Sequence, residues 1–233
     1  MKVLLIDTCG ELGSVALAET GEFPPRVVTI ALPGRSASER LIGAVRELVS
    51  QGGAKLRDLD AIAVVHGPGS FTGVRVGVSA AKGLCEALGL PVVAISRLAV
   101  LAEAAREELG QKADREGASP IGPLVAALDA GRGEFYCGLY ENGICLQEAL
   151  RTRAELLELA ARGPVVVSEP RVAEALRDLS PLLVDASTGE AALGIALRRI
   201  ASGRFDDIGT LDANYLRRTD AEIFAKQAAG AAR

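Results

Sequence analysis

Aromatic and histidine side chains are scarce in this 233-residue sequence, which has no Trp and a single histidine, His66. Aromatic residues make up only 3% of the chain, which argues against a surface that stacks single-stranded bases. One imidazole provides no second ligand for a histidine-rich metal site. No G-x-S-x-G segment is present to suggest a serine hydrolase. We therefore interpret His66 as a strand-end residue packed near a turn.

Cysteine pairs and long apolar runs are also missing. The four cysteines, Cys9, Cys85, Cys137 and Cys145, lie far apart and form no C-x-x-C pair, which favours reduced thiols over a disulfide framework. No stretch reaches the ~20 apolar residues that cross a membrane, and the N-terminal apolar run is too short for a signal peptide. The sequence predicts a soluble, cytoplasmic protein.

The charge is slightly acidic, with a formal net value of −4. An extended basic surface for nucleic acid is not favoured, although a local patch or a basic partner could still supply one. Hydrophobic residues at 49% and charged residues at 24% are typical of a globular protein. The length allows one large core or two modest ones.

Residues 60–90 form the most distinctive stretch. An apolar run ends at Gly67-Pro68-Gly69, and a helix is predicted to begin near Ser70 or Phe71 and to end at Gly89. Each interior glycine costs about 0.5–1 kcal/mol relative to alanine. Some structure must therefore approach this helix closely. Its residues with little or no side chain are Gly73, Gly77, Ser79, Ala80, Ala81, Gly83 and Ala87.

Three explanations of this bare helix remain open. The glycines could let the helix sit tightly on its own sheet. A second helix, from another subunit, could instead pack on the face that Gly73 and Gly77 share. The turn could also cradle a phosphate at the helix N-terminus, but neither the Lys-Ser/Thr ending of a P-loop nor a G-x-G-x-x-G motif is present.

The order of predicted elements repeats. Strand-strand-strand-helix-strand-helix-strand-helix is predicted twice, around a polar linker at residues 111–122. The first lobe is expected to span residues 1–110, its last helix covering 97–109, and the second lobe 123–233. Capping boxes are predicted at Ser36 with Glu39 and at Thr152 with Glu155. Residues 221–233 would be either a helix that returns to the first lobe or a frayed tail.

This duplication predicts an α/β fold of two lobes, each a mixed sheet flanked by helices. It is similar to the actin, Hsp70 and sugar-kinase superfamily, with its ribonuclease-H-like lobes. In that superfamily, two strand-end carboxylates face the phosphates and Mg²⁺ of a nucleotide. Asp7, Thr8 and Asp129 are the corresponding candidates here. The other interpretation is that the two aspartates simply cap the following turns.

The phosphate cradle of such an enzyme is poorly represented. Glu11 follows the first candidate carboxylate, and Glu169-Pro170 stands where a glycine pair would lie in the second lobe. Glutamate repels phosphate, and proline removes a backbone donor. We expect no cofactor to bind independently, while a nucleotide or Mg²⁺ at a junction with a partner stays open.

Three segments carry a family resemblance: MKVLLIDTCGELGSVALAE, HGPGSFTGVRVGVSAAKGL and LDAGRGEFYCGLY. They closely resemble the TsaB (YeaZ) family of bacterial threonylcarbamoyladenosine biosynthesis proteins. Two segments depart from that pattern: residues 35–39 lack a histidine, and residues 211–217 are a loose version of a P-x-Y-x-R tail.

The resemblance implies a scaffold subunit that is not itself the catalyst. It would pair with a larger paralogue, TsaD, which transfers a threonylcarbamoyl group to the adenosine next to the tRNA anticodon. The ATPase TsaE would join the pair, and tRNA would be reached through the complex. The alternatives are an autonomous ATP-dependent phosphotransferase of the actin-like superfamily, using Asp7 and Asp129 with Mg²⁺, and a peptidase.

The resemblance also implies a pairing surface built from the first two helices, residues 38–50 and 71–88. The same surface would close as a homodimer when the chain is alone. A leucine at Gly77 is then expected to weaken pairing and to leave the fold intact. The interface candidates are Leu41, Val45, Leu48, Gly73, Arg75, Val76, Gly77 and Ala80.

Overall fold

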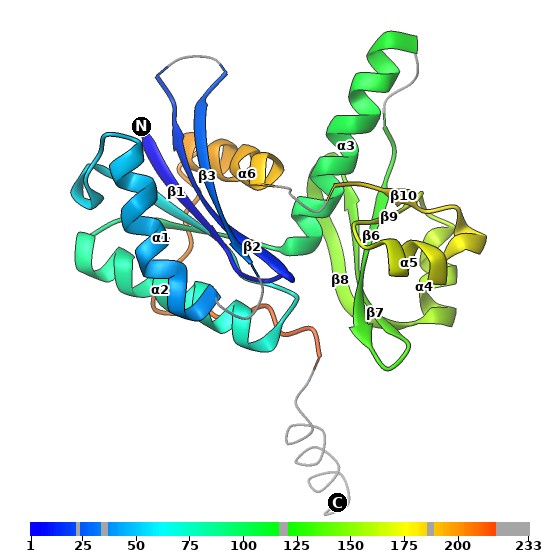
Figure 1. Ribbon diagram of the computed structural model, residues 1–233. Coiled ribbons are helices and arrows are strands. Elements are labelled where there is room, and N and C mark those ends of the chain that lie inside the picture. The colour runs from blue at the N-terminus through cyan, green and yellow to red at the C-terminus, as the bar shows by residue number, and fades with distance from the viewer. Residues whose placement is uncertain (22–23, 34–36, 117–120, 186–188, 218–233) are drawn as a thin grey trace, which may run out of the picture.

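The computed structural model describes residues 1–21, 24–33, 37–116, 121–185 and 189–217. The predicted capping residue Ser36 and the segment 221–233 lie outside these ranges. The described chain forms two lobes, each built on a five-stranded mixed sheet (Figure 1). No helix in this part of the chain is both long and apolar enough to cross a membrane.

The first sheet begins with an antiparallel meander of its first three strands. The central strand, β1, pairs antiparallel with β2 and parallel with β4. The resulting order is β3-β2-β1-β4-β5. The strands are β1 (Lys2–Asp7), β2 (Leu12–Glu19), β3 (Arg26–Pro33), β4 (Ala61–Val65) and β5 (Val92–Ile95).

The second sheet repeats this arrangement. Its order is β10-β9-β6-β7-β8, with β6 antiparallel to β7 and parallel to β9, so β6 occupies the place of β1. This shared order confirms the duplicated, actin-like fold class. Asn142 and Gly143 have positive φ angles of 51° and 76°, as a tight Asn-Gly hairpin turn between β7 and β8 requires. The strands are β6 (Leu124–Gly131), β7 (Glu134–Glu141), β8 (Ile144–Thr152), β9 (Val165–Val167) and β10 (Leu182–Leu183).

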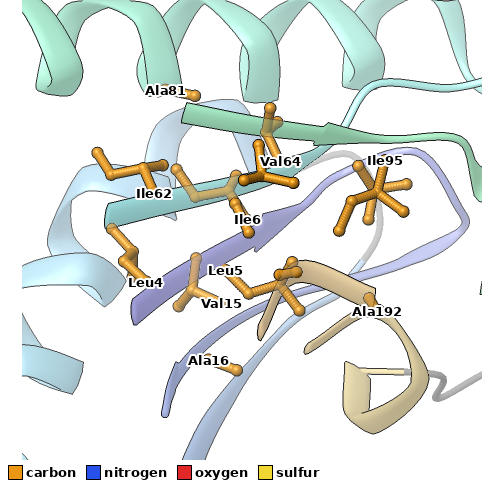
Figure 2. Close-up of a cluster of buried hydrophobic side chains, with 14 of the residues drawn as sticks. Leu4, Leu5, Ile6, Val15, Ala16, Ile62, Val64, Ala81, Ile95 and Ala192 are labelled. Atoms are coloured by element: carbon orange, nitrogen blue, oxygen red, sulfur yellow. The ribbon is translucent and has the colours of Figure 1, made fainter. Parts of the chain in front are cut away.

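Helices cover both faces of the first sheet. Helices α1 (Ala37–Gln51) and α2 (Phe71–Leu88) lie on one face, and α6 (Gly189–Ala201) lies on the other (Figure 1). Figure 2 shows Ala81 of α2 on one side of the buried strands and Ala192 of α6 on the other. The core of the first lobe therefore includes an element that follows the second lobe in sequence.

Helix α3 (Arg97–Glu116) is longer than the sequence predicts. We expected it to end near residue 109, and the linker 111–122 to be irregular. The helix continues because residues 111–116 contain good helix formers, and Lys112 pairs with Glu108 at 2.6 Å one turn earlier. These interactions outweigh the single glycine, Gly110, that suggested a stop.

The two lobes pack together through α3, and the chain after α6 returns to the first lobe. Leu98 and Leu101 of α3 pack in one cluster with Leu124 and Leu128 of the second sheet. After α6, Asp206 forms an isolated bridge with Val92 of the first lobe. The division into residues 1–110 and 123–233 stays a prediction, and the structure adds that α6 packs on the first sheet.

The remaining helices belong to the second lobe, except for one short 3₁₀ turn before β4 in the first lobe. Thr152 and Glu155 form the predicted capping box at the start of α4. The chain from Pro170 to Leu179 forms α5 and a separate 3₁₀ turn. These elements are α4 (Arg153–Ala160), α5 (Pro170–Ala175), η2 (Leu56–Asp58) and η3 (Arg177–Leu179).

Candidate functional site

The two strand-end aspartates lie in the cleft between the lobes. Asp7 lines a cavity of about 430 Å³ and Asp129 lines an adjoining cavity of about 790 Å³. Both cavities are also lined by Arg97, Glu169 and Arg171. The duplicated topology therefore brings the two carboxylates to the same region, as the sequence predicts.

Each aspartate caps the turn that follows it. The Asp7 Oδ1 accepts a hydrogen bond from the Cys9 N–H at 2.9 Å, and the Asp129 Oδ1 accepts one from the Gly131 N–H at 2.7 Å. Burial raises the pKa of Asp7, although the Cys9 N–H and the charge of Arg97 oppose this effect. The turn-capping interpretation therefore accounts for both residues.

Thr8 is not free to hold a ligand. Its side chain is buried, and its hydroxyl donates a hydrogen bond to the Gly73 carbonyl oxygen at 2.6 Å. The hydroxyl proton is thus engaged in holding α2 against the turn after β1. Of the three cofactor candidates, Asp7 and Asp129 present a partly exposed carboxylate.

Ion pairs occupy the centre of the cleft. Glu169, at the start of α5, accepts two hydrogen bonds from Arg171 at 2.9 and 3.0 Å. The same carboxylate lies 3.8 Å from Arg97, at the start of α3, and Arg171 lies 3.7 Å from Asp129. Each guanidinium in the cleft thus already faces a carboxylate.

This donor set does not fit a nucleotide phosphate with Mg²⁺. The carboxylates of Glu11 and Glu169 would repel phosphate oxygens, and Pro170 offers no N–H donor at the start of α5. Within the described ranges, no group of three or more histidine, cysteine, aspartate or glutamate side chains could hold a metal ion.

The glycines of α2 face the chain itself. A Cβ at Gly73 would overlap the Thr8 carbonyl oxygen, and a Cβ at Gly77 would overlap the Thr8 Oγ1. Of the three explanations of the bare helix, close packing within the chain therefore accounts for both residues. The same finding corrects the expectation for Gly77→Leu, because a leucine there would collide with the first lobe.

The structure also changes which side chains could form a pairing surface. Leu41, Val45 and Leu48 are buried in the first core, so they support α1 and do not reach the surface. On α2, Arg75 is exposed, and Val76 and Ala80 are partly exposed. The pairing surface itself stays a prediction.

Open space lies beside other residues of the same two helices. A Cβ at Gly43 of α1 or at Gly83 of α2 would meet no atom within 4 Å. Ile42 is 46% exposed beside Gly43. These residues, with the exposed and partly exposed positions of α2, define the outer α1–α2 face: Ile42, Gly43, Arg75, Val76, Ala80 and Gly83.

An aromatic contact at one end of this face was missed by the sequence analysis. The Arg75 guanidinium lies 3.7 Å from the centre of the Phe71 ring, and its Nε–H donates to the Tyr215 hydroxyl at 2.6 Å. Phe71 and Arg75 are four residues apart on a helix, which was the available signal. The sequence pattern could not predict that Tyr215, from the C-terminal part of the chain, lies beside α2.

Glu148 of β8 was also missed. Its carboxylate accepts hydrogen bonds from the Ser96 and Tyr140 hydroxyls, and from the Asn214 side-chain amide at 2.7 Å. Ser96 precedes α3, Tyr140 lies in β7 and Asn214 follows α6. One carboxylate thus ties together three segments at the junction of the lobes, a role with no signature in local sequence.

Known proteins are similar to most of this chain. The family model TsaD, described as tRNA N6-adenosine threonylcarbamoyltransferase, matches residues 31–183. The tRNA threonylcarbamoyladenosine biosynthesis protein TsaB of Escherichia coli strain K12 is 36% identical over 147 residues, which cover 62% of this chain and 58% of that protein. TsaB of Bacillus subtilis strain 168 is 36% identical over 149 residues, which cover 63% and 59%. The chain thus spans a little under three fifths of the length of these relatives.

A solved structure supports the same grouping. A crystal structure from Pseudomonas aeruginosa, described as an uncharacterized protein with similarity to peptidase YEAZ, has 29% sequence identity and a TM-score of 0.69. That match covers 93% of this chain and 99% of the other. A second structure, described as YeaZ from the same organism, has 29% identity and a TM-score of 0.66, with coverage of 91% and 100%. The chain belongs to the tRNA N6-adenosine threonylcarbamoyltransferase (TsaD) family and, within it, to the TsaB/YeaZ group.

Proposed function

We propose that this protein is a non-catalytic subunit in the biosynthesis of threonylcarbamoyladenosine in tRNA. It acts by pairing with the catalytic paralogue TsaD. The observation that carries the proposal is the geometry of the cleft. There the two aspartates cap turns and the arginines are paired with carboxylates, which leaves no cradle for a phosphate. The names of its relatives supply the pathway.

The outer α1–α2 face is the pairing surface in this proposal. The absence of a side chain at Gly43 and Gly83 lets the backbone of a partner helix approach closely. The exposed apolar side chain of Ile42 and the partly exposed Val76 supply apolar area beside the glycines. When the paralogue is absent, the same face closes as a homodimer. TsaE joins the heterodimer, and tRNA is bound through the complex.

The proposal is tested by substituting one position on this face. Gly83→Leu adds a large side chain where the isolated chain has open space, so the fold is expected to survive and affinity for TsaD to fall by tenfold or more, about 1.4 kcal/mol. Ala154→Leu on the exposed side of α4, in the other lobe, is the matched control. Calorimetry gives the affinity, and circular dichroism checks the fold. Wild-type affinity in Gly83→Leu would remove this face as the pairing surface.

Activity tests the role of the subunit. Threonylcarbamoyl transfer by TsaD and TsaE, assayed on tRNA, is expected to require this chain. The isolated chain is expected to show no ATP turnover. Turnover that is abolished by Asp7→Ala and by Asp129→Ala would support the autonomous phosphotransferase instead. Light scattering over a range of protein concentrations tests the homodimer.

A further inference from the structure

A second, smaller cavity lies between the lobes and away from the cleft. Its volume is about 150 Å³, and it lies between α3, the β7–β8 turn and the end of α6. Its polar lining is dominated by guanidinium groups, which is unusual in a chain with a net charge of −4. The four arginines of this pocket, here called the arginine pocket, are Arg106, Arg198, Arg199 and Arg204.

A buried carboxylate positions two of these arginines. Glu103 is 3% exposed and accepts a bidentate pair of hydrogen bonds from Arg106, at 2.6 and 3.0 Å. The same carboxylate accepts a third hydrogen bond from Arg198 at 2.6 Å. Guanidinium groups held in this way lose little further freedom when they bind an anion. The pocket is therefore preorganised.

The charges around the pocket do not cancel. Arg199 is paired with Asp206 at 3.0 Å. Arg106 and Arg198 share one carboxylate, Glu103, as their ion-pair partner. Arg204 donates to the Ser202 hydroxyl at 2.9 Å and makes no ion pair within the described part of the chain. Glu107 also lies near Arg106 and Arg198, and burial and the neighbouring charge of Glu103 raise its pKa. Within the described residues, the positive charge of Arg204 is therefore the one that no ion pair offsets.

The size of the pocket limits its ligand. A volume of about 150 Å³ is below the ~300–1,000 Å³ of pockets that enclose a whole small molecule. It suits one anionic group carried by something larger. Arginine forks match the oxygen geometry of phosphate. Arg204 is exposed, and the ring of the next residue, Phe205, is 43% exposed, so a nucleic-acid strand would meet an aromatic surface beside the charge.

We propose that the arginine pocket binds a phosphate group of the RNA backbone, which gives this subunit a direct contact with the tRNA substrate. The choice of RNA as the source rests on the proposed function. The affinity for phosphate rests only on the pocket. Free inorganic phosphate is the other source of the same chemistry.

The test compares Arg204→Ala with Arg57→Ala in the full-length protein. Arg204 anchors no ion pair among the residues that the structure describes, so its loss is expected to leave the fold unchanged. Arg57 is an arginine of η2 whose side chain is 75% exposed, and its substitution removes the same charge away from the pocket. Binding of an anticodon stem-loop RNA is measured by fluorescence anisotropy over a range of salt concentrations. Binding of inorganic phosphate is measured separately by calorimetry.

We expect Arg204→Ala to weaken RNA binding several-fold and to reduce the slope of log affinity against log salt by about one, with Arg57→Ala unchanged. If Arg204→Ala loses phosphate binding but binds the RNA as the wild type does, the pocket is an anion site whose ligand is free phosphate. If both probes bind Arg204→Ala as they bind the wild type, or if neither probe binds the wild type, the proposal is overturned. Pairing with TsaD does not enter these assays, so the proposed function can fail independently.

Discussion

The Thr8 hydroxyl donates a hydrogen bond to the Gly73 carbonyl oxygen at 2.6 Å, and through it the turn after β1 holds α2. Gly77, one helical turn further on, lies directly over the same threonine. The contact is part of the packing of the first lobe. It explains why a helix with costly glycines is stable in this position.

Gly77→Ala is expected to destabilise the protein by about 1–3 kcal/mol. The added methyl group would overlap the Thr8 Oγ1, and either the hydroxyl or the helix would have to shift. Equilibrium unfolding in urea measures the loss. Gly83→Ala in the same helix is the matched control, because its Cβ would meet open space. That control is expected to gain up to about 1 kcal/mol from higher helix propensity. Equal effects of the two substitutions would contradict the packing explanation.

Glu148→Ala is expected to reduce stability by about 1–3 kcal/mol. The substitution removes the acceptor shared by Ser96, Tyr140 and Asn214, and it leaves the mostly buried Tyr140 hydroxyl without its partner. Burial raises the pKa of Tyr140, as does the neighbouring Glu148, so its hydroxyl stays protonated and needs an acceptor.

Urea unfolding measures this loss, and Glu158→Ala on the exposed side of α4 is the control. Because Glu148 joins both lobes, the native state should also open more readily at their junction. Hydrogen exchange at the start of α3 is expected to increase. Unchanged stability and exchange would show that the three donors find other acceptors.

Glu103→Gln is expected to lose about 2 kcal/mol at pH 7. Burial works to raise the pKa of Glu103, but the hydrogen bonds and charges of Arg106 and Arg198 outweigh it, and the pKa lies below its usual value. A lowered pKa in the folded state contributes stability above the pKa of the unfolded chain. That contribution disappears as the pH falls through the pKa of the folded state.

The wild type should therefore lose stability as the pH falls below about 4.5, the ordinary value for glutamate. Glu103→Gln should show a flatter profile there, so the two proteins converge in acid. Unfolding free energies from pH 7 to pH 3 provide the measurement. A constant difference over that range would show that the carboxylate acts by shape and not by charge.

Asp7→Asn is expected to be neutral or to stabilise the protein by up to about 1 kcal/mol at pH 7. The amide oxygen can still accept the Cys9 N–H, while the cost of burying a charge is removed. The sign is opposite to that of Glu103, because burial raises the pKa of Asp7 and its charged form is the unfavourable one in the folded state. Urea unfolding at pH 7 and pH 4 compares the two proteins, and the benefit should shrink at the lower pH. A loss of more than about 1 kcal/mol at pH 7 would show that the fold requires the charge.

Local pattern was sufficient to predict most elements of this protein. The period of the apolar residues and the turn signals predicted the order of strands and helices in both halves. Ser70 and Gly89 indicated the limits of α2, and their caps are present in the structure. The repeated order then predicted the duplicated fold. Such signals depend on residues close together in the chain, so they can be read without the tertiary structure.

Only the tertiary structure decided what the residues of α2 and of the cleft contact. Gly77 could have faced a partner or its own chain, because helical spacing shows which residues share a face and not what lies opposite. The hydrogen bonds Asn214–Glu148, Arg75–Tyr215 and Arg198–Glu103 join residues 66, 140 and 95 positions apart. Their partners are brought together by the packing of α3 and α6 between two sheets, and no local periodicity records that arrangement.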